Sequence, residues 1–119
     1  MGRVKGAIGR FGEELAAGWL QDAGLRILDR NWRCAEGEID IVAADGDTLV
    51  FCEVKTRSGT GFGDPAEAVT AAKSARLRRL ALRWLAAHGL GWRELRFDVV
   101  TVVRRRDADP VVRHLKDAF

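Results

Sequence analysis

The sequence predicts a mixed α/β domain in which two helices pack on one sheet. Its 119 residues match the size of one globular domain, so residues 1–119 are expected to form a single unit. Two segments carry apolar residues at helical spacing, and several others are short apolar runs of strand length. The resulting order is one helix, three strands, one helix and two strands. This order is typical of a layered fold built on a sheet.

The first helix is expected from about Gly6 to Ala23. Its apolar residues recur every three or four positions, and Gly24 follows as a stop signal. We expect the resulting apolar stripe to pack on the sheet. The stripe consists of Ile8, Phe11, Leu15 and Trp19, widened by Ala16 and Leu20.

Three strands are expected next, as an antiparallel meander. The second and third flank Asp45-Gly46, a strong hairpin signal. A loop of these two residues alone pairs Asp40 with Phe51, whereas a loop of four residues pairs Asp40 with Glu53. Either loop keeps the side chains on the same face. The expected strands are Leu25–Trp32, Glu38–Ala44 and Thr48–Thr56.

A long second helix is expected to begin at Asp64-Pro65-Ala66-Glu67, where Asp64 can cap the helix. It would end at His88-Gly89 after roughly 23 residues, which is long enough to cross the sheet. The next strand can therefore pair in parallel with its neighbour. The apolar stripe of this helix would be Val69, Leu77, Leu80, Trp84 and Leu85, and the last two strands would be Leu95–Val103 and Val111–Leu115.

Composition and residue spacing limit the classes of protein and of functional site that this chain can represent. The chain lacks a membrane-length apolar run and a signal-peptide pattern, so a cytoplasmic protein is expected. Cys34 and Cys52 lack ligand spacing and are expected to be free thiols, while His88 and His114 are isolated. The 20 basic and 17 acidic residues give a net charge of +3. Arginines and Lys73 concentrate between residues 73 and 83, which suits a nucleic-acid backbone or, equally, a solvated helix face.

The most informative pattern is a set of charged residues on the hairpin. Alternation along the two strands places Asp40, Glu53 and Lys55 on one face, with Glu38 beside Asp40. Neighbouring carboxylates repel one another unless a cation joins them, and oxygen-only ligands favour Mg²⁺ or Mn²⁺. Lys55 could then orient water and stabilise charge on a phosphate. The alternative is a cross-strand salt-bridge ladder.

Longer motifs occur in order along the chain: Gly9-Arg10-Phe11-Gly12-Glu13, Asn31-Trp32-Arg33, Gly37-Glu38-Ile39-Asp40, Phe51-Cys52-Glu53-Val54-Lys55-Thr56-Arg57 and Phe62-Gly63-Asp64-Pro65-Ala66-Glu67-Ala68-Val69. Together they resemble the YraN-like family, which is related to Holliday junction resolvases. Asp40 followed by Glu53-Val54-Lys55 also resembles the PD-(D/E)xK motif of nucleases. The resemblance implies a restriction-endonuclease-like fold with a mixed sheet and a metal-dependent phosphodiesterase site.

Carried onto this chain, the resemblance implies that Asp40 and Glu53 bind Mg²⁺ or Mn²⁺ and that Lys55 acts on water and phosphate. The helix acid that assists them would be Glu13, with Glu14 as its rival. The implied function is a Mg²⁺-dependent DNA endonuclease, with branched DNA as one substrate. The alternative is a non-catalytic module that binds nucleic acid or a partner protein and retains the nuclease fold.

Further expectations concern binding and assembly. Lys73 falls within the apolar stripe of the second helix, so it either reaches the edge of the site or extends past the helix into solvent. A homodimer is left open, because paired cuts in a four-way junction require two-fold symmetry. Asp98, inside an apolar strand, is expected to form a structural salt bridge. The expected nucleic-acid contacts are Lys73, Arg57, Arg76 and Arg83.

Overall fold

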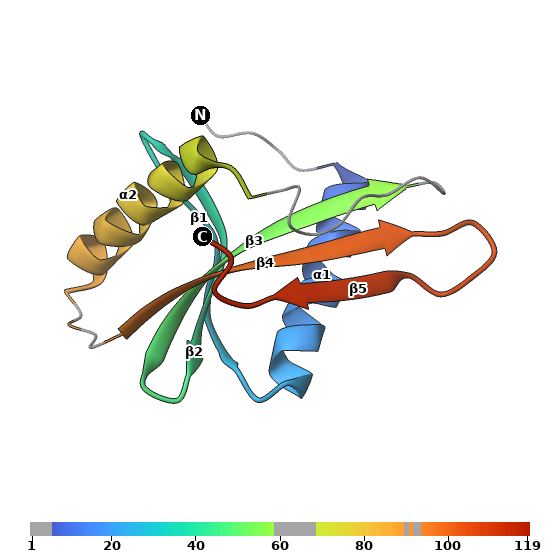
Figure 1. The fold of residues 1–119 in the computed structure, drawn as a ribbon, viewed down its shortest axis with the longest axis horizontal. Helices are drawn as coiled ribbons and strands as arrows, with labels where there is room; N and C mark the ends of the chain where they lie inside the picture. The colour runs from blue at the N-terminus through green and yellow to red at the C-terminus, as the bar shows by residue number, and fades with distance from the viewer. Residues whose placement is uncertain (1–5, 59–68, 90, 92–93) are drawn as a thin grey trace.

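A five-stranded mixed sheet forms the centre of the protein, in the order β1-β2-β3-β4-β5 (Figure 1). The computed structural model describes residues 6–58, 69–89, 91 and 94–119. Neighbouring strands are antiparallel except β3 and β4, which pair in parallel as the sequence allowed. The strands are β1 (Arg26–Cys34), β2 (Gly37–Asp45), β3 (Thr48–Ser58), β4 (Glu94–Arg104) and β5 (Val111–Leu115).

The two helices cover opposite faces of the sheet. Helix α1 (Ala7–Asp22) packs on the face that carries Val50 and Cys52, and α2 (Ala71–His88) packs on the face that carries Leu49 and Phe51 (Figure 1). Each helix thus covers one set of alternating strand residues, which accounts for the two apolar cores. Among the described residues, neither helix combines the length and the apolar character needed to cross a membrane.

Helix α1 turns a different face to the sheet than its apolar pattern predicts. Ile8, Phe11 and Trp19 remain 37–44% exposed, so the prediction that they pack on the sheet is wrong. Small residues face the sheet instead, because the helix lies very close to it: a Cβ added at Gly12 would fall 1.8 Å from Oγ1 of Thr56. The buried residues of α1 are Gly12, Glu13, Ala16, Ala17 and Leu20.

Helix α2 begins later than expected. Thr70 is extended and caps the helix, accepting a hydrogen bond from the backbone N–H of Lys73 (3.1 Å). The helix therefore has 18 residues, and Val69 precedes it. The expected start, at residues 64–67, lies outside the described residues. The end at Gly89 is confirmed, because this glycine adopts the left-handed conformation that terminates helices.

The hairpin between β2 and β3 has the register that was expected for a four-residue loop, although its loop has two residues and lies one position later than Asp45-Gly46. Asp45 pairs with Thr48 and Ile41 with Cys52, so Gly46 and Asp47 form the loop. Gly46 has a positive φ of 59°, a conformation that glycine adopts without strain. The pairing stops at Ile41, although β2 continues to Gly37 along β1. The two strands therefore separate at Asp40, and this separation creates the space for the site.

Candidate functional site

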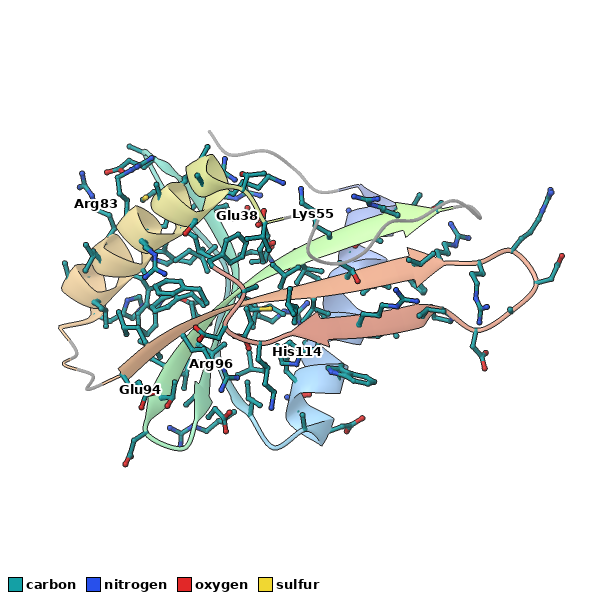
Figure 2. All side chains as sticks on the ribbon, viewed as in Figure 1. Glu38, Lys55, Arg83, Glu94, Arg96 and His114 are labelled. Atoms are coloured by element: carbon teal, nitrogen blue, oxygen red, sulfur yellow. The ribbon has the colours of Figure 1, made fainter. Side chains whose placement is uncertain are left out.

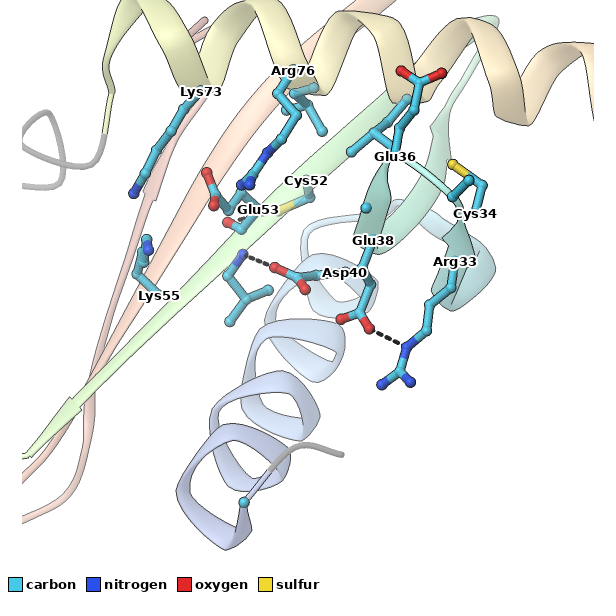
Figure 3. A pocket seen from close by; sticks show the side chains of 16 residues that line it. Arg33, Cys34, Glu36, Glu38, Asp40, Cys52, Glu53, Lys55, Lys73 and Arg76 are labelled. Carbon is cyan, nitrogen blue, oxygen red and sulfur yellow. Dashed lines mark hydrogen bonds and ion pairs between the residues drawn. The ribbon is translucent and has the colours of Figure 1, made fainter. Parts of the chain in front are cut away.

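A cleft of about 1090 Å³ opens where β2 separates from β3, beside the first half of α2 (Figure 3). Its lining includes the three residues of the sequence motif, Asp40, Glu53 and Lys55. Lys73 and Arg76 of α2 line the same cleft. The cleft is thus lined by both carboxylates and cations, and most of these charged residues come from β2, β3 and α2.

Three carboxylates converge at the α1 side of this space. One oxygen each from Glu13, Glu38 and Asp40 lies within 4.8 Å of the others, and we call this group the acidic cluster. Glu13 is only 2% exposed, because the close approach of α1 at Gly12 presses it against the strands. Arginines lie at the outer side of the cluster. Nε of Arg33 donates to Glu38 (2.6 Å), and Arg30 lies 3.9 Å from Glu13.

Asp40 is held at the point where the strands separate. Its Oδ2 accepts a hydrogen bond of 2.8 Å from the backbone N–H of Val54, which ties the side chain of β2 to the main chain of β3 (Figure 3). A carboxylate that accepts a backbone hydrogen bond is fixed in direction as well as in place. Asp40 is therefore positioned by the backbone of both strands.

The alternation of side chains between the two faces of the sheet, which predicted one shared face for the three charged residues, is interrupted in β2. Ile41 packs in the core under α1, whereas Ile39, two residues earlier, packs in the core under α2. Asp40 consequently lies near Glu13 of α1 rather than on a regular face shared with Glu53 and Lys55. The prediction that the three side chains share one face of the sheet is thus corrected. They line the same cleft instead, from two strands that have separated.

Cations gather on the other wall of the cleft. Figure 3 shows Lys55 and Lys73 pointing toward the same region, near Glu53. The pKa of Lys73 is lowered, first by the contact with the side chain of Lys55 and then by partial burial, while Glu53 opposes the shift. Two neighbouring ammonium groups repel each other, and an anion bound beside them relieves this repulsion. This wall is suited to bind phosphate.

Sequence comparison places these residues in a family. The profile of the uncharacterised protein family UPF0102 matches residues 12–102. A UPF0102 protein of Beutenbergia cavernae is 58% identical over 114 residues, covering 96% of this chain and 97% of the relative. A UPF0102 protein of Frankia alni is 59% identical over 117 residues, covering 98% of each.

The chain belongs to family UPF0102. A third UPF0102 protein, from Acidothermus cellulolyticus, is 53% identical over 123 aligned positions, covering 95% of this chain and 93% of the relative. The family assignment confirms the resemblance to the YraN-like family. Residues 62–68 of the last motif lie outside the described part of the chain.

In this UPF0102 protein the two helix glutamates have different environments. Glu13 lies buried in the acidic cluster, whereas Glu14 is 72% exposed and pairs with Arg30 at 2.8 Å. Periodicity left this choice open, because it does not show which side of α1 faces the sheet. The assignment of Glu13 as a ligand stays a prediction.

Glu38 is the acidic residue that the predicted ligand set omitted. It supplies the third carboxylate of the acidic cluster, while Glu53 lies on the wall with Lys55 and Lys73. The signal that could have found Glu38 was its spacing from Asp40, two residues along one strand. Glu53 remains a predicted ligand at the opposite side of the same cleft.

The four predicted nucleic-acid contacts differ in their surroundings. Lys73 and Arg76 line the cleft, and Arg57 is exposed near the end of β3. Arg83 lies farther along α2, outside the cleft lining, and pairs with Glu36 at 2.5 Å. The cleft-lining pair is therefore better placed than Arg83 to meet a phosphate.

Asp98 forms the structural interaction that the sequence predicted. It is fully buried and accepts hydrogen bonds from Nε and Nη2 of Arg96, each 3.0 Å at its shortest, and from the backbone N–H of Asp117 (2.9 Å). His114 Nε2 lies 2.8 Å from Oδ2 of Asp98. Burial alone would raise the pKa of Asp98, but the bonds from His114 and Arg96 outweigh it and lower the pKa.

Proposed function

We propose that this UPF0102 protein is a Mg²⁺-dependent endonuclease that hydrolyses phosphodiester bonds in DNA. The observation that carries the proposal is the convergence of three carboxylates within 4.8 Å beside a cleft whose other wall carries lysines. Carboxylates alone would repel a phosphate, and lysines alone would only bind it. The combination suits a reaction at phosphorus.

The acidic cluster fits a hard divalent cation. Its donors are carboxylate oxygens from α1 and β2, which Mg²⁺ and Mn²⁺ prefer over nitrogen or sulfur. Glu13, Glu38 and Asp40 would hold the ion, with Glu53 as a ligand from the facing strand. Arg33 donates a hydrogen bond to Glu38 at 2.6 Å, and this bond would weaken when the ion binds Glu38. A bound ion would neutralise charge on the phosphate and lower the pKa of a coordinated water.

Other residues act on the substrate. Lys55 projects from β3 into the cleft next to Glu53, where its ammonium can orient the attacking water and stabilise the charge that builds on the phosphate oxygens. Lys73 and Arg76 on α2 can bind a neighbouring phosphate of the same strand, because they line the same space. Arg57 extends the positive surface along β3.

The test is cleavage of labelled linear, flap and four-way DNA in Mg²⁺, Mn²⁺ or EDTA. We expect cleavage with either metal, none in EDTA, and a loss of at least about 10²-fold in Asp40→Asn. Glu14→Gln is the matched control, because it removes a carboxylate from the same region of the fold that lies outside the acidic cluster.

Two results would contradict the proposal. Cleavage by Asp40→Asn at the wild-type rate would indicate a contaminating nuclease. A wild type that binds DNA tightly but cleaves none of the three substrates with either metal would instead support the non-catalytic binding module.

A further inference from the structure

Helix α1 carries an apolar stripe that the described part of the chain leaves partly exposed. Ile8 is 41% exposed, Phe11 37% and Trp19 44%, and half-buried Leu15 lies between them. These four residues fall within about 80° of arc on a helical projection, so they form one continuous strip along the helix. Scattered exposed apolar residues are ordinary on a protein surface, but three on one strip of a helix mark a contact surface, with Leu15 between them packed partly on the core.

Gly18 lies in the middle of this helix, and no contact with the residues that the structure describes requires a glycine there. A glycine in a helix interior costs stability relative to alanine. At Gly12 the glycine is required by contact with Thr56, whereas a Cβ added at Gly18 would meet nothing within 4 Å. Gly18 faces solvent next to the apolar stripe. A small residue at that position allows another helix to approach closely.

The charges at the two ends of the stripe are opposite. The guanidinium of Arg104 lies 5.9 Å from the ring centre of Phe11, at the N-terminal half of α1. Asp22 lies in the last turn, one turn beyond Trp19 on the same side of the helix. An acidic residue in the last turn opposes the helix dipole, so its position is unfavourable in the isolated chain.

We infer that a second copy of this chain covers the stripe, with α1 pairing antiparallel to α1 of the partner about a two-fold axis near Leu15. This arrangement places Phe11 against the partner's Trp19 and places Arg104 next to the partner's Asp22. Asp22 then lies beside the positive end of the partner's helix. The stripe, the glycine and the charge pattern are thus complementary to themselves, as a two-fold contact requires.

The size of the surface sets the expected strength of the dimer. Helix α1 has 16 residues, or about 24 Å of length. One helix pair of this length buries less than a standard interface, so we expect a reversible dimer that dissociates at about 1–100 µM. Glu13 lies on the buried side of α1, away from the centre of the contact, although Ile8 at one end of the stripe lines the same small pocket as Glu13.

Sedimentation equilibrium over about two decades of protein concentration tests the inference. We expect wild type to dimerise as concentration rises, and Trp19→Glu to raise the dissociation constant at least about tenfold. Leu82→Glu is the matched control, because Leu82 is 63% exposed on α2 and lies outside the proposed contact. A wild type that stays monomeric throughout, or a control that weakens the dimer as much as Trp19→Glu, overturns the inference.

Two further variants separate loss of contact from loss of folding. Gly18→Leu should raise the thermal midpoint of the monomer by about 2–5 °C and yet weaken the dimer about tenfold, because the side chain fills the approach space. Asp22→Arg and Arg104→Glu should each weaken the dimer, and the double variant should recover to within about threefold of wild type. Absence of recovery rejects the antiparallel pairing. These readouts do not depend on nuclease activity.

Discussion

The protein buries acidic side chains in two regions that differ in what surrounds them. In the first, Asp98 of β4 has its oxygens bonded by Arg96, His114 and a backbone N–H. In the second, Glu13, Glu38 and Asp40 gather against one another beside an open cleft. Figure 2 shows Arg96 and His114 on one side of β4, and Glu38 and Lys55 on the other side, near the start of α2.

The difference teaches how to tell a structural carboxylate from a functional one. Asp98 has a partner for each oxygen and no access to solvent, so a further ligand has no place there. The acidic cluster places carboxylates closer to one another than charge repulsion favours, with Arg30 and Arg33 nearby and the cleft beside it. A site of this kind gains most from a cation that arrives from solution.

The largest expected effect is on catalysis, in Lys55→Met. Methionine keeps an apolar stem of similar length and removes the ammonium, so DNA affinity should fall little and the salt slope should drop by at most about 1. Cleavage should fall about 10²–10³-fold, the scale for losing a group that acts on the transition state. Single-turnover cleavage and filter binding at several salt concentrations measure the two quantities.

Lys116→Met is the matched control, since Lys116 is exposed and lies outside the cleft lining. It should cleave as wild type does. If Lys55→Met retained near wild-type cleavage, Lys55 would be a ladder residue and the assigned mechanism would fail.

The next largest effect is on stability and has different sizes in the two regions. Asp98→Asn should lower the free energy of unfolding by about 2–3 kcal/mol, because Arg96 and His114 lose a buried charge partner. Asp40→Asn in EDTA should leave it within about 0.5 kcal/mol of wild type, because an amide oxygen can still accept from Val54 and carboxylate repulsion is relieved. Urea denaturation measures both, and equal losses would remove the distinction between the regions.

The pH dependence follows from the lowered pKa of Asp98. A carboxyl whose pKa is lower in the folded state stabilises the fold above its unfolded pKa and loses this contribution as pH falls. The stability gap between wild type and Asp98→Asn should therefore be complete above about pH 5 and shrink below about pH 4. A gap that stayed constant down to pH 3 would show that the charge of Asp98 is not the cause.

The smallest expected effect is a difference in Mn²⁺ affinity between variants of Glu38 and of Glu53. Titration calorimetry should detect Mn²⁺ binding that disappears in Asp40→Asn with Glu53→Gln, because two negative charges are lost. Among single variants, Glu38→Gln should weaken Mn²⁺ binding by about tenfold and Glu53→Gln by less, since only Glu38 lies in the acidic cluster. The reverse order would move the ion toward Lys55, and wild-type binding by the double variant would place it elsewhere.

Most of the secondary structure could be predicted, because it depends on local periodicity. Val111–Leu115 was predicted to the residue, and the four other strands differ only at their ends. The start of α2 was missed because the prediction placed the cap at Asp64-Pro65, whereas Thr70 caps the described helix. Helix ends are the least certain part of such a prediction.

The site was predictable in its residue types and less so in its geometry. Asp40, Glu53 and Lys55 do line one cleft. Alternation could not predict that β2 would leave β3 at Asp40, since strand parity assumes continuous pairing. The sequence could not show that Glu38 lies near Glu13, because Glu38 is on a strand and Glu13 is on a helix whose buried side was mispredicted.

By itself, the sequence determined the order of elements, the family, and the charged residues that the cleft brings together, because these depend on local pattern and residue type. The tertiary structure decided which side of α1 faces the sheet, through the close contact of Gly12 with Thr56. With this side of α1 facing the sheet, Glu13 is buried beside Asp40, and Phe11 and Trp19 remain at the surface. Helical periodicity describes which residues share a side, but only packing against the rest of the chain determines which side is buried.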